Sequence, residues 1–106
     1  MIPTEWRETA NADNSAATAT KAAKTTGRHT VASVSASYSS SSTSGLLTIT
    51  VTIAGVSSTI THYVHGADVI PLDIIGDINT VVSASLAASG TGGVVGRVNM
   101  VGHTDG

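Results

Sequence analysis

Residues 47–53 read Leu-Thr-Ile-Thr-Val-Thr-Ile, so large apolar side chains and threonines alternate over seven consecutive positions. A period of two is typical of a β-strand with one buried and one exposed face. After Ala54-Gly55, which predicts a tight turn, the alternation resumes over residues 56–64. The two segments together predict an antiparallel hairpin.

The same period of two extends in both directions from this hairpin. Pro71 lies inside one of the further segments and confines that strand to a sheet edge or an irregular position. After Arg28 no segment has helical periodicity. The remaining predicted strands are residues 29–38, 69–75, 80–88 and 94–101. Six strands separated by Gly- and Ser-rich turns predict an all-β fold, a small antiparallel β-sandwich or jelly-roll-like domain over residues 28–106.

The first 27 residues differ in composition from the rest. Residues 9–27 are Ala, Thr, Asn, Ser and Lys apart from Asp13 and Gly27, with no large apolar side chain, so they predict no helix or strand that packs on a core. The sequence therefore predicts an extended N-terminal arm over residues 1–27, held in place by a partner. Its predicted partner-binding residues are two apolar anchors and four cations, namely Ile2, Trp6, Arg7, Lys21, Lys24 and Arg28.

The composition also restricts the function. Hydrophobic residues make up 41% of the chain, but there is no Phe, one Trp and two Tyr, which predicts a thin core of aliphatic side chains. Charged residues are only 11%, against roughly 25% in typical soluble domains. A surface of Ser, Thr and Gly favours one of two interpretations. Either it is covered by other surfaces, or it is the hydroxyl-rich exterior of an extracellular domain.

The same composition argues against several classes of partner and site. Without cysteine there is no disulfide or thiolate metal site. The five basic residues are too dispersed for a nucleic-acid patch, and no apolar run is long enough to span a membrane. The first residues lack the pattern of a signal peptide, so we expect synthesis in a cytoplasm.

No combination of residues predicts catalysis or a cofactor. His62 and His65 are three apart, which on a strand places them on opposite faces. A metal shared across a symmetry axis is the one arrangement that this leaves open. Residues 90–96 are glycine-rich, yet they lack the dinucleotide-binding spacing and the phosphate-loop lysine, and they predict a hairpin loop. Asp73 and Asp77 predict turn caps. We therefore expect no enzyme, no metal and no cofactor.

Two pairs of segments carry a resemblance to a known group. One is residues 29–39, which end in Ser-Tyr-Ser, followed by Gly45-Leu46-Leu47-Thr48-Ile49. The other is residues 79–90, with Leu-Ala-Ala-Ser-Gly at their end, followed by residues 93–99 with Gly-Arg-Val-Asn. In this pattern residues 29–102 resemble small virion proteins of tailed bacteriophages.

The resemblance implies a β-sandwich subunit of a virion that decorates or cements the capsid and self-associates as a trimer. Its implied partner is the major capsid protein or another virion protein, and it brings no catalytic or cofactor residues. Three alternatives stay open. They are a tail or fibre component, a glycan- or host-surface-binding module, and a surface-layer or pilus subunit, which the missing export signal disfavours.

Overall fold

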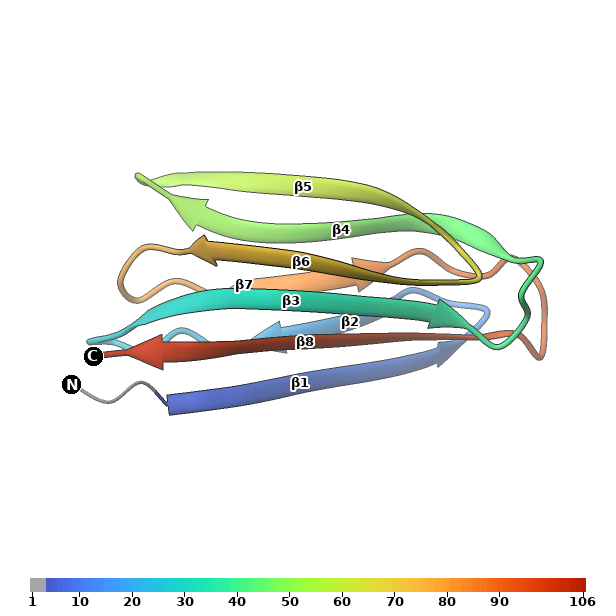
Figure 1. Cartoon of the computed structure of the whole chain (residues 1–106), viewed down its shortest axis with the longest axis horizontal. Coiled ribbons are helices and arrows are strands. Elements are labelled where there is room, and N and C mark those ends of the chain that lie inside the picture. Colours follow the sequence, from blue (N-terminus) through green and yellow to red (C-terminus); the bar gives the residue numbers. More distant parts are fainter. Residues whose placement is uncertain (1–3) are drawn as a thin grey trace.

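The computed structural model describes residues 4–106 as an all-β sandwich of two four-stranded antiparallel sheets (Figure 1). The described residues contain no helix. The strands are β1 (Thr4–Asp13), β2 (Ala17–Lys21), β3 (Arg28–Tyr38), β4 (Ser44–Ile53), β5 (Val56–His65), β6 (Ala67–Ile75), β7 (Val82–Leu86) and β8 (Val95–Asp105). The predicted all-β sandwich is confirmed, and the six strands expected from the sequence correspond to β3 through β8.

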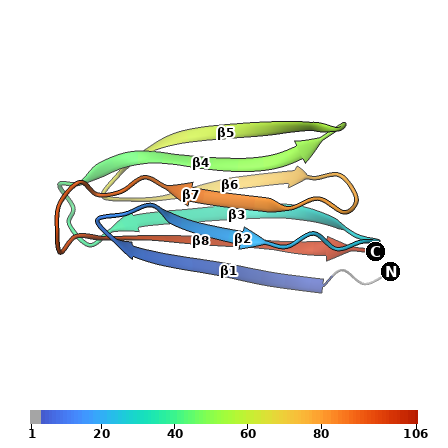
Figure 2. The same ribbon diagram turned by 180° about the vertical axis from the view of Figure 1, so that it is seen from behind.

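The strand order places four strands at edges. One sheet, sheet A, has the order β1-β8-β3-β6, and the other, sheet B, has the order β2-β7-β4-β5. β1 packs near β2 and β6 near β5, so the sandwich has a β1/β2 edge and a β5/β6 edge. In both views β5 is the outermost strand on one side and β1 on the other (Figures 1 and 2).

The prediction of an extended arm is wrong for the part of residues 1–27 that the structure describes. β1 pairs with β8 over ten residues, and β2 pairs with β7 over five. Thus each of the two sheets takes one edge strand from this segment. The physical reason is that alanine suffices as an inward side chain where two sheets approach closely, and Ala17 and Ala19 are fully buried. The anchor prediction for Ile2 lies outside the described residues.

The core lies between the sheets and is mainly aliphatic. Leu47, Ile49 and Val51 of β4 are buried, which confirms the inward face predicted from the alternation. The neighbouring strand β7 adds Val82 and Leu86, and the facing sheet adds Val31, Val34, Val98 and Met100. Trp6 and Tyr38 are the two buried aromatic residues of the core. At roughly 25 cal/mol per Å² of buried apolar area, these side chains supply the main driving force for folding.

Irregular backbone is concentrated in sheet A. The pairing of β3 with both neighbours shifts between Val31 and Ser33, which marks a β-bulge at Ala32. Next to it on β6, Asp73 has a φ of 140°, in a region that favours glycine. Pro71 lies on β6, at the edge of sheet A, as its missing N–H requires. Sheet B has no register shift in any of its three strand pairs.

The Asp77 carboxylate fixes the turn between β4 and β5. Its two oxygens accept hydrogen bonds from the backbone N–H groups of Ala54 (3.0 Å) and Gly55 (2.8 Å). The hydrogen bond from Gly55 lowers the pKa of Asp77 the most, and the bond from Ala54 lowers it further. The positive charge of Arg28 acts in the same direction. The predicted capping role of Asp77 is confirmed, although the turn it caps is 22 residues away in sequence.

Candidate interaction surfaces

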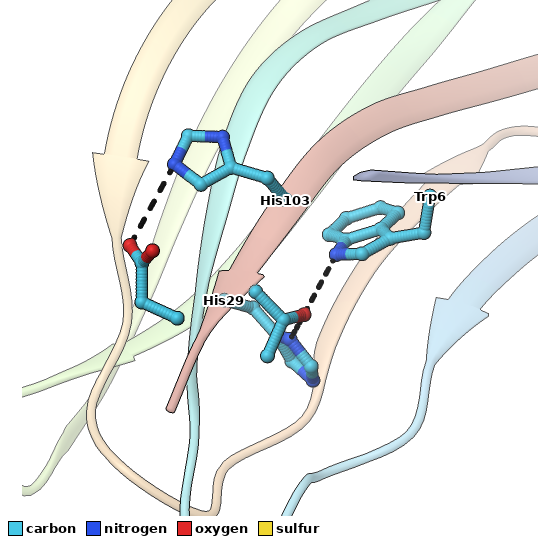
Figure 3. A network of polar contacts seen from close by, with 5 residues as sticks. Trp6, His29 and His103 are labelled. Carbon is cyan, nitrogen blue, oxygen red and sulfur yellow. Dashed lines mark hydrogen bonds and ion pairs between the residues drawn. The ribbon is translucent and has the colours of Figure 1, made fainter. Parts of the chain in front are cut away.

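A buried chain of hydrogen bonds ties the β1/β2 edge to the core (Figure 3). The Trp6 indole N–H donates to the Thr104 hydroxyl at 3.0 Å, and the Nδ1 atom of His29 lies 2.6 Å from the same oxygen. The rings of Trp6 and His29 meet edge to face with centroids 5.8 Å apart. Residues from β1, β3 and β8 thus form one cluster.

With a neutral His29 imidazole, the donors and acceptors of this cluster have one consistent order. His29 Nε2 lies 2.7 Å from the carbonyl oxygen of Ala22, which can only accept, so Nε2 carries the hydrogen. Nδ1 then accepts from the Thr104 hydroxyl, which in turn accepts from Trp6. Since every polar atom of the cluster has a partner, its role is structural. Trp6, predicted as an apolar anchor for a partner, packs in the core of this chain and is only 9% exposed, and its contact with a partner stays a prediction.

Two of the predicted cations, Lys21 and Lys24, line one hollow at the end of the sandwich where β2 ends, while Arg28 is the first residue of β3. The Lys21 ammonium sits over the Trp6 ring, 5.7 Å from its centroid, and Lys24 donates to the backbone oxygen of Gly106 at 2.8 Å. The hollow has a volume of about 310 Å³ and is lined by Trp6, both lysines, His29 and their neighbours. Arg7 lies on the outer face of β1, opposite Val101.

The remaining titratable residues form pairs rather than a larger cluster. His62 contacts Asp68 at 3.2 Å, and His103 lies 3.8 Å from Asp105, on the opposite side of β8 from Trp6 and His29 (Figure 3). His65 stacks against Tyr63, with 5.2 Å between ring centroids. Within residues 4–106 no three His, Asp or Glu side chains converge as metal ligands. His62 and His65 are on opposite faces of β5, as the strand period predicts.

The glycine-rich segment at residues 90–96 connects two sheets. β7 belongs to sheet B and β8 to sheet A, so the interpretation of a hairpin loop is wrong. Gly96 has already joined β8 and is buried between the sheets. A Cβ atom there would meet Leu86 at 3.3 Å and Tyr38 at 3.4 Å, so a close approach explains this glycine.

The exposed large apolar side chains of the described part lie on β5 and β6 and on the segments next to them. All the large apolar side chains that are exposed in the described part lie between residues 46 and 81. They are Leu46, Ile53, Val56, Tyr63, Val69, Ile75, Ile78 and Val81. Val69 is 72% exposed and Val56 is 63% exposed. Between residues 29 and 96 the chain has no Lys or Arg, so no basic side chain of its own interrupts this surface. Sequence reasoning missed it, because the alternation does not show which strand lies outermost.

The outer face of sheet B is a second unusual surface. Because its strands pair without a register shift, hydroxyl side chains line up across all four strands. One row is Thr18, Ser85, Thr48 and Thr61, and the next is Thr20, Ser83, Thr50 and Thr59.

Tyr38 closes the far end of the core. Its hydroxyl donates to the carbonyl oxygen of Ala87 at 2.8 Å. Burial raises the pKa of this hydroxyl, and the nearby Tyr63 adds to the rise. A side chain at Gly45 would collide with the Tyr38 ring, so the glycine of the predicted Gly-Leu-Leu motif makes room for this tyrosine.

Over residues 4–106 the structure has no helix that is long and apolar enough to cross a membrane. No known protein family model matches the sequence, and no curated protein is significantly similar to it.

Proposed function

We propose that this chain is a structural protein of a bacteriophage virion, which binds the surface of the capsid and reinforces it. The observation that carries the proposal is the concentration of exposed apolar side chains at the β5/β6 edge. Exposed apolar side chains that gather in one part of a small domain favour a surface that another protein covers. The predictions that the chain is not an enzyme and that it acts in the virion belong to this proposal.

The location of the resembling segments supports it. The residues that resemble small virion proteins lie on β3, β4, β7 and β8 or next to them. These four are the central strands of the two sheets. The resemblance therefore concerns the framework of the sandwich, while the edge strands β1, β2, β5 and β6 are the parts that adapt it to particular neighbours. The proposal also includes self-association of this chain. The trimer that the resemblance implies is one closed assembly of this kind.

The most exposed apolar side chain, Val69, offers a direct test. It lies on the outer face of β6, at the edge of sheet A. A carboxylate at position 69 would have to lose its hydration when the capsid covers this surface. Val69→Asp is therefore expected to weaken binding to purified capsids about tenfold or more. Asn11→Asp is the matched control, because Asn11 is exposed on β1, the opposite edge of the same sheet.

The measurement is co-sedimentation of the purified chain with capsids of its own phage. The proposal predicts binding of the natural chain and of Asn11→Asp, and its loss in Val69→Asp. If the natural chain stays in the supernatant, the virion proposal fails. Equal binding of both variants would instead remove the β5/β6 edge as the capsid contact.

A second candidate function, recognition of glycans on a host surface, is favoured by one side chain. Tyr63 is 54% exposed on the outer face of β5, beside Leu46, and an exposed aromatic ring is a platform for sugar stacking. Binding on a glycan array that Tyr63→Ala abolishes would support this function over capsid binding. An array without hits would remove it.

A further inference from the structure

The four edge strands of the sandwich are protected to different degrees against pairing with another strand. Natural proteins block such edges with charges, proline, bulges or short strands. β1 carries four charged residues, and β2 is only five residues long and ends in Lys21. β6 has Pro71, the adjoining bulge, Asp68 and Asp73. β5 is ten residues long and contains no Lys, Arg, Asp, Glu or Pro. Among the edges described, β5 alone has none of these protections.

The turn before β5 determines which of its backbone groups are free. Ala54 and Gly55 have φ values of 52° and 78°, as in the two-residue type I′ turn of a hairpin. In such a hairpin the flanking pair, Ile53 and Val56, is hydrogen-bonded, and bonded and non-bonded pairs then alternate. The N–H and C=O groups of the odd-numbered residues of β5 therefore point away from β4. In the middle of the strand these are Ser57, Thr59, Thr61 and Tyr63.

We propose that β5 pairs in antiparallel fashion with β5 of a second copy of this chain, about a two-fold axis at Ile60. The pairing joins two copies of sheet B into one eight-stranded sheet. Each copy contributes the outward groups of four residues, so about eight backbone hydrogen bonds form. Since the axis passes through a non-bonded position, the two Ile60 Cα atoms lie about 4.5 Å apart.

The side chains favour a second copy as the occupant, because β5 is complementary to itself in this register. On the inner face Ile60 meets Ile60 of the second copy, and Val56 meets Val64 of the second copy. On the outer face Thr59 lies opposite Thr61 of the second copy, which pairs hydroxyl with hydroxyl. Shifting the axis to Thr61 would instead place His62 against Ile60. No like charges meet at any position, since β5 has no carboxylate or ammonium group.

This inference deepens the proposed function, because it names one partner of the same β5/β6 edge. A two-fold axis closes the assembly at two copies, so it predicts a dimer where the resemblance implies a trimer. The contact with the capsid uses the outer face of β6, which the pairing of β5 leaves in place. The two proposals therefore fail separately. A chain that binds capsids as a monomer overturns only the pairing, and a dimer that does not bind capsids overturns only the proposed function.

The first test is the mass of the full chain in solution, by light scattering over a range of concentrations. The pairing predicts a species of twice the 10.6 kDa chain mass. Thr59→Lys with Thr61→Lys brings four ammonium groups together at the axis and is expected to leave only monomer. The control, Thr18→Lys with Thr20→Lys, changes two exposed threonines on the same face of sheet B at its other edge, and should stay dimeric.

The second test fixes the register and does not require a disruptive variant. The chain has no cysteine, and Ile60→Cys would place two sulfurs across the axis at a Cα separation that suits a disulfide. Mild oxidation should cross-link this variant into a dimer, while Thr9→Cys on β1 should remain uncross-linked. A chain that is monomeric at all concentrations, a trimer mass, or equal cross-linking of both cysteine variants would overturn the pairing.

Discussion

The two edges of this sandwich differ in which side chains they bury and which they expose. At the β1/β2 edge, small alanines and one tryptophan face inward, Glu5, Arg7 and Asp13 face outward, and Trp6, Thr104 and His29 share buried hydrogen bonds. At the β5/β6 edge, apolar side chains of both strands are exposed, and β5 has no Lys, Arg, Asp or Glu. The segment with the more apolar sequence is thus the exposed one. The segment poor in large apolar residues completes the core.

The largest expected effect follows from the loss of a whole edge. Deletion of residues 1–27 removes one strand from each sheet, together with Trp6, Ala17 and Ala19 of the core. We expect the remaining chain not to fold, which reverses the sequence expectation of an intact sandwich over residues 28–106. The amide proton spectrum of the deletion variant is the measurement. A dispersed spectrum with the β3–β8 signals in place would contradict the account.

A smaller effect compares one aromatic residue from each edge. Trp6→Ala removes a buried indole and leaves the Thr104 hydroxyl without its donor, so it should cost about 3–5 kcal/mol of unfolding free energy. Tyr63→Ala removes an exposed ring and should change stability by about 0.5 kcal/mol or less. Chemical denaturation at low protein concentration measures both. Similar losses for both variants would show that the two edges do not differ as described.

The hydrogen-bond chain itself is tested by a nearly isosteric change. Thr104→Val leaves the Trp6 N–H and the His29 Nδ1 atom without a partner in the interior, at a cost of about 1–3 kcal/mol. Thr59→Val on the outer face of β5 is the control and should be close to neutral. If Thr104→Val unfolds at the same denaturant concentration as the natural chain, the cluster contributes nothing.

The smallest effect concerns Asp77, whose carboxylate accepts two backbone hydrogen bonds from the turn before β5. Because folding lowers the pKa of Asp77, its contribution is present above the ordinary pKa of an aspartic acid. The contribution is lost as the pH falls through the lower pKa of the folded state. Asp77→Asn should therefore be less stable than the natural chain at neutral pH, with the difference shrinking in acid. Urea unfolding across this range tests it, and a difference independent of pH would argue against this role of the carboxylate.

The sequence predicted the central strands well for a clear physical reason. Residues 47–53 alternate large aliphatic side chains with threonine, and this signal is strong enough to identify the strand and its buried face. Residues 9–13 and 17–21 also alternate, as Thr-Ala-Asn-Ala-Asp and Ala-Thr-Ala-Thr-Lys. This period of two is the sequence feature that indicates strands here. It is weak because a buried alanine removes little apolar area from water, so the same pattern also fits a polar linker.

The candidate site was less predictable. Which strand lies at an edge depends on pairing between distant segments, as when β7 and β8 are consecutive in sequence but belong to different sheets. Only the strand that contains Pro71 was predicted from the sequence to lie at a sheet edge or in an irregular position. Lys21 and Lys24 are close in sequence and line the same hollow, whereas the contact of Trp6 with Thr104, 98 residues away, depends on the fold.

The most direct test of the contrast between the two edges is hydrogen exchange of individual backbone amides, measured by NMR at low and high protein concentration. The account predicts that the outward amides of Ser57, Thr59, Thr61 and Tyr63 exchange rapidly in dilute solution and become protected as the concentration rises. Amides of β1 and β2 should show no such dependence. Protection that grows with concentration at the β1/β2 edge, or at neither edge, would contradict it.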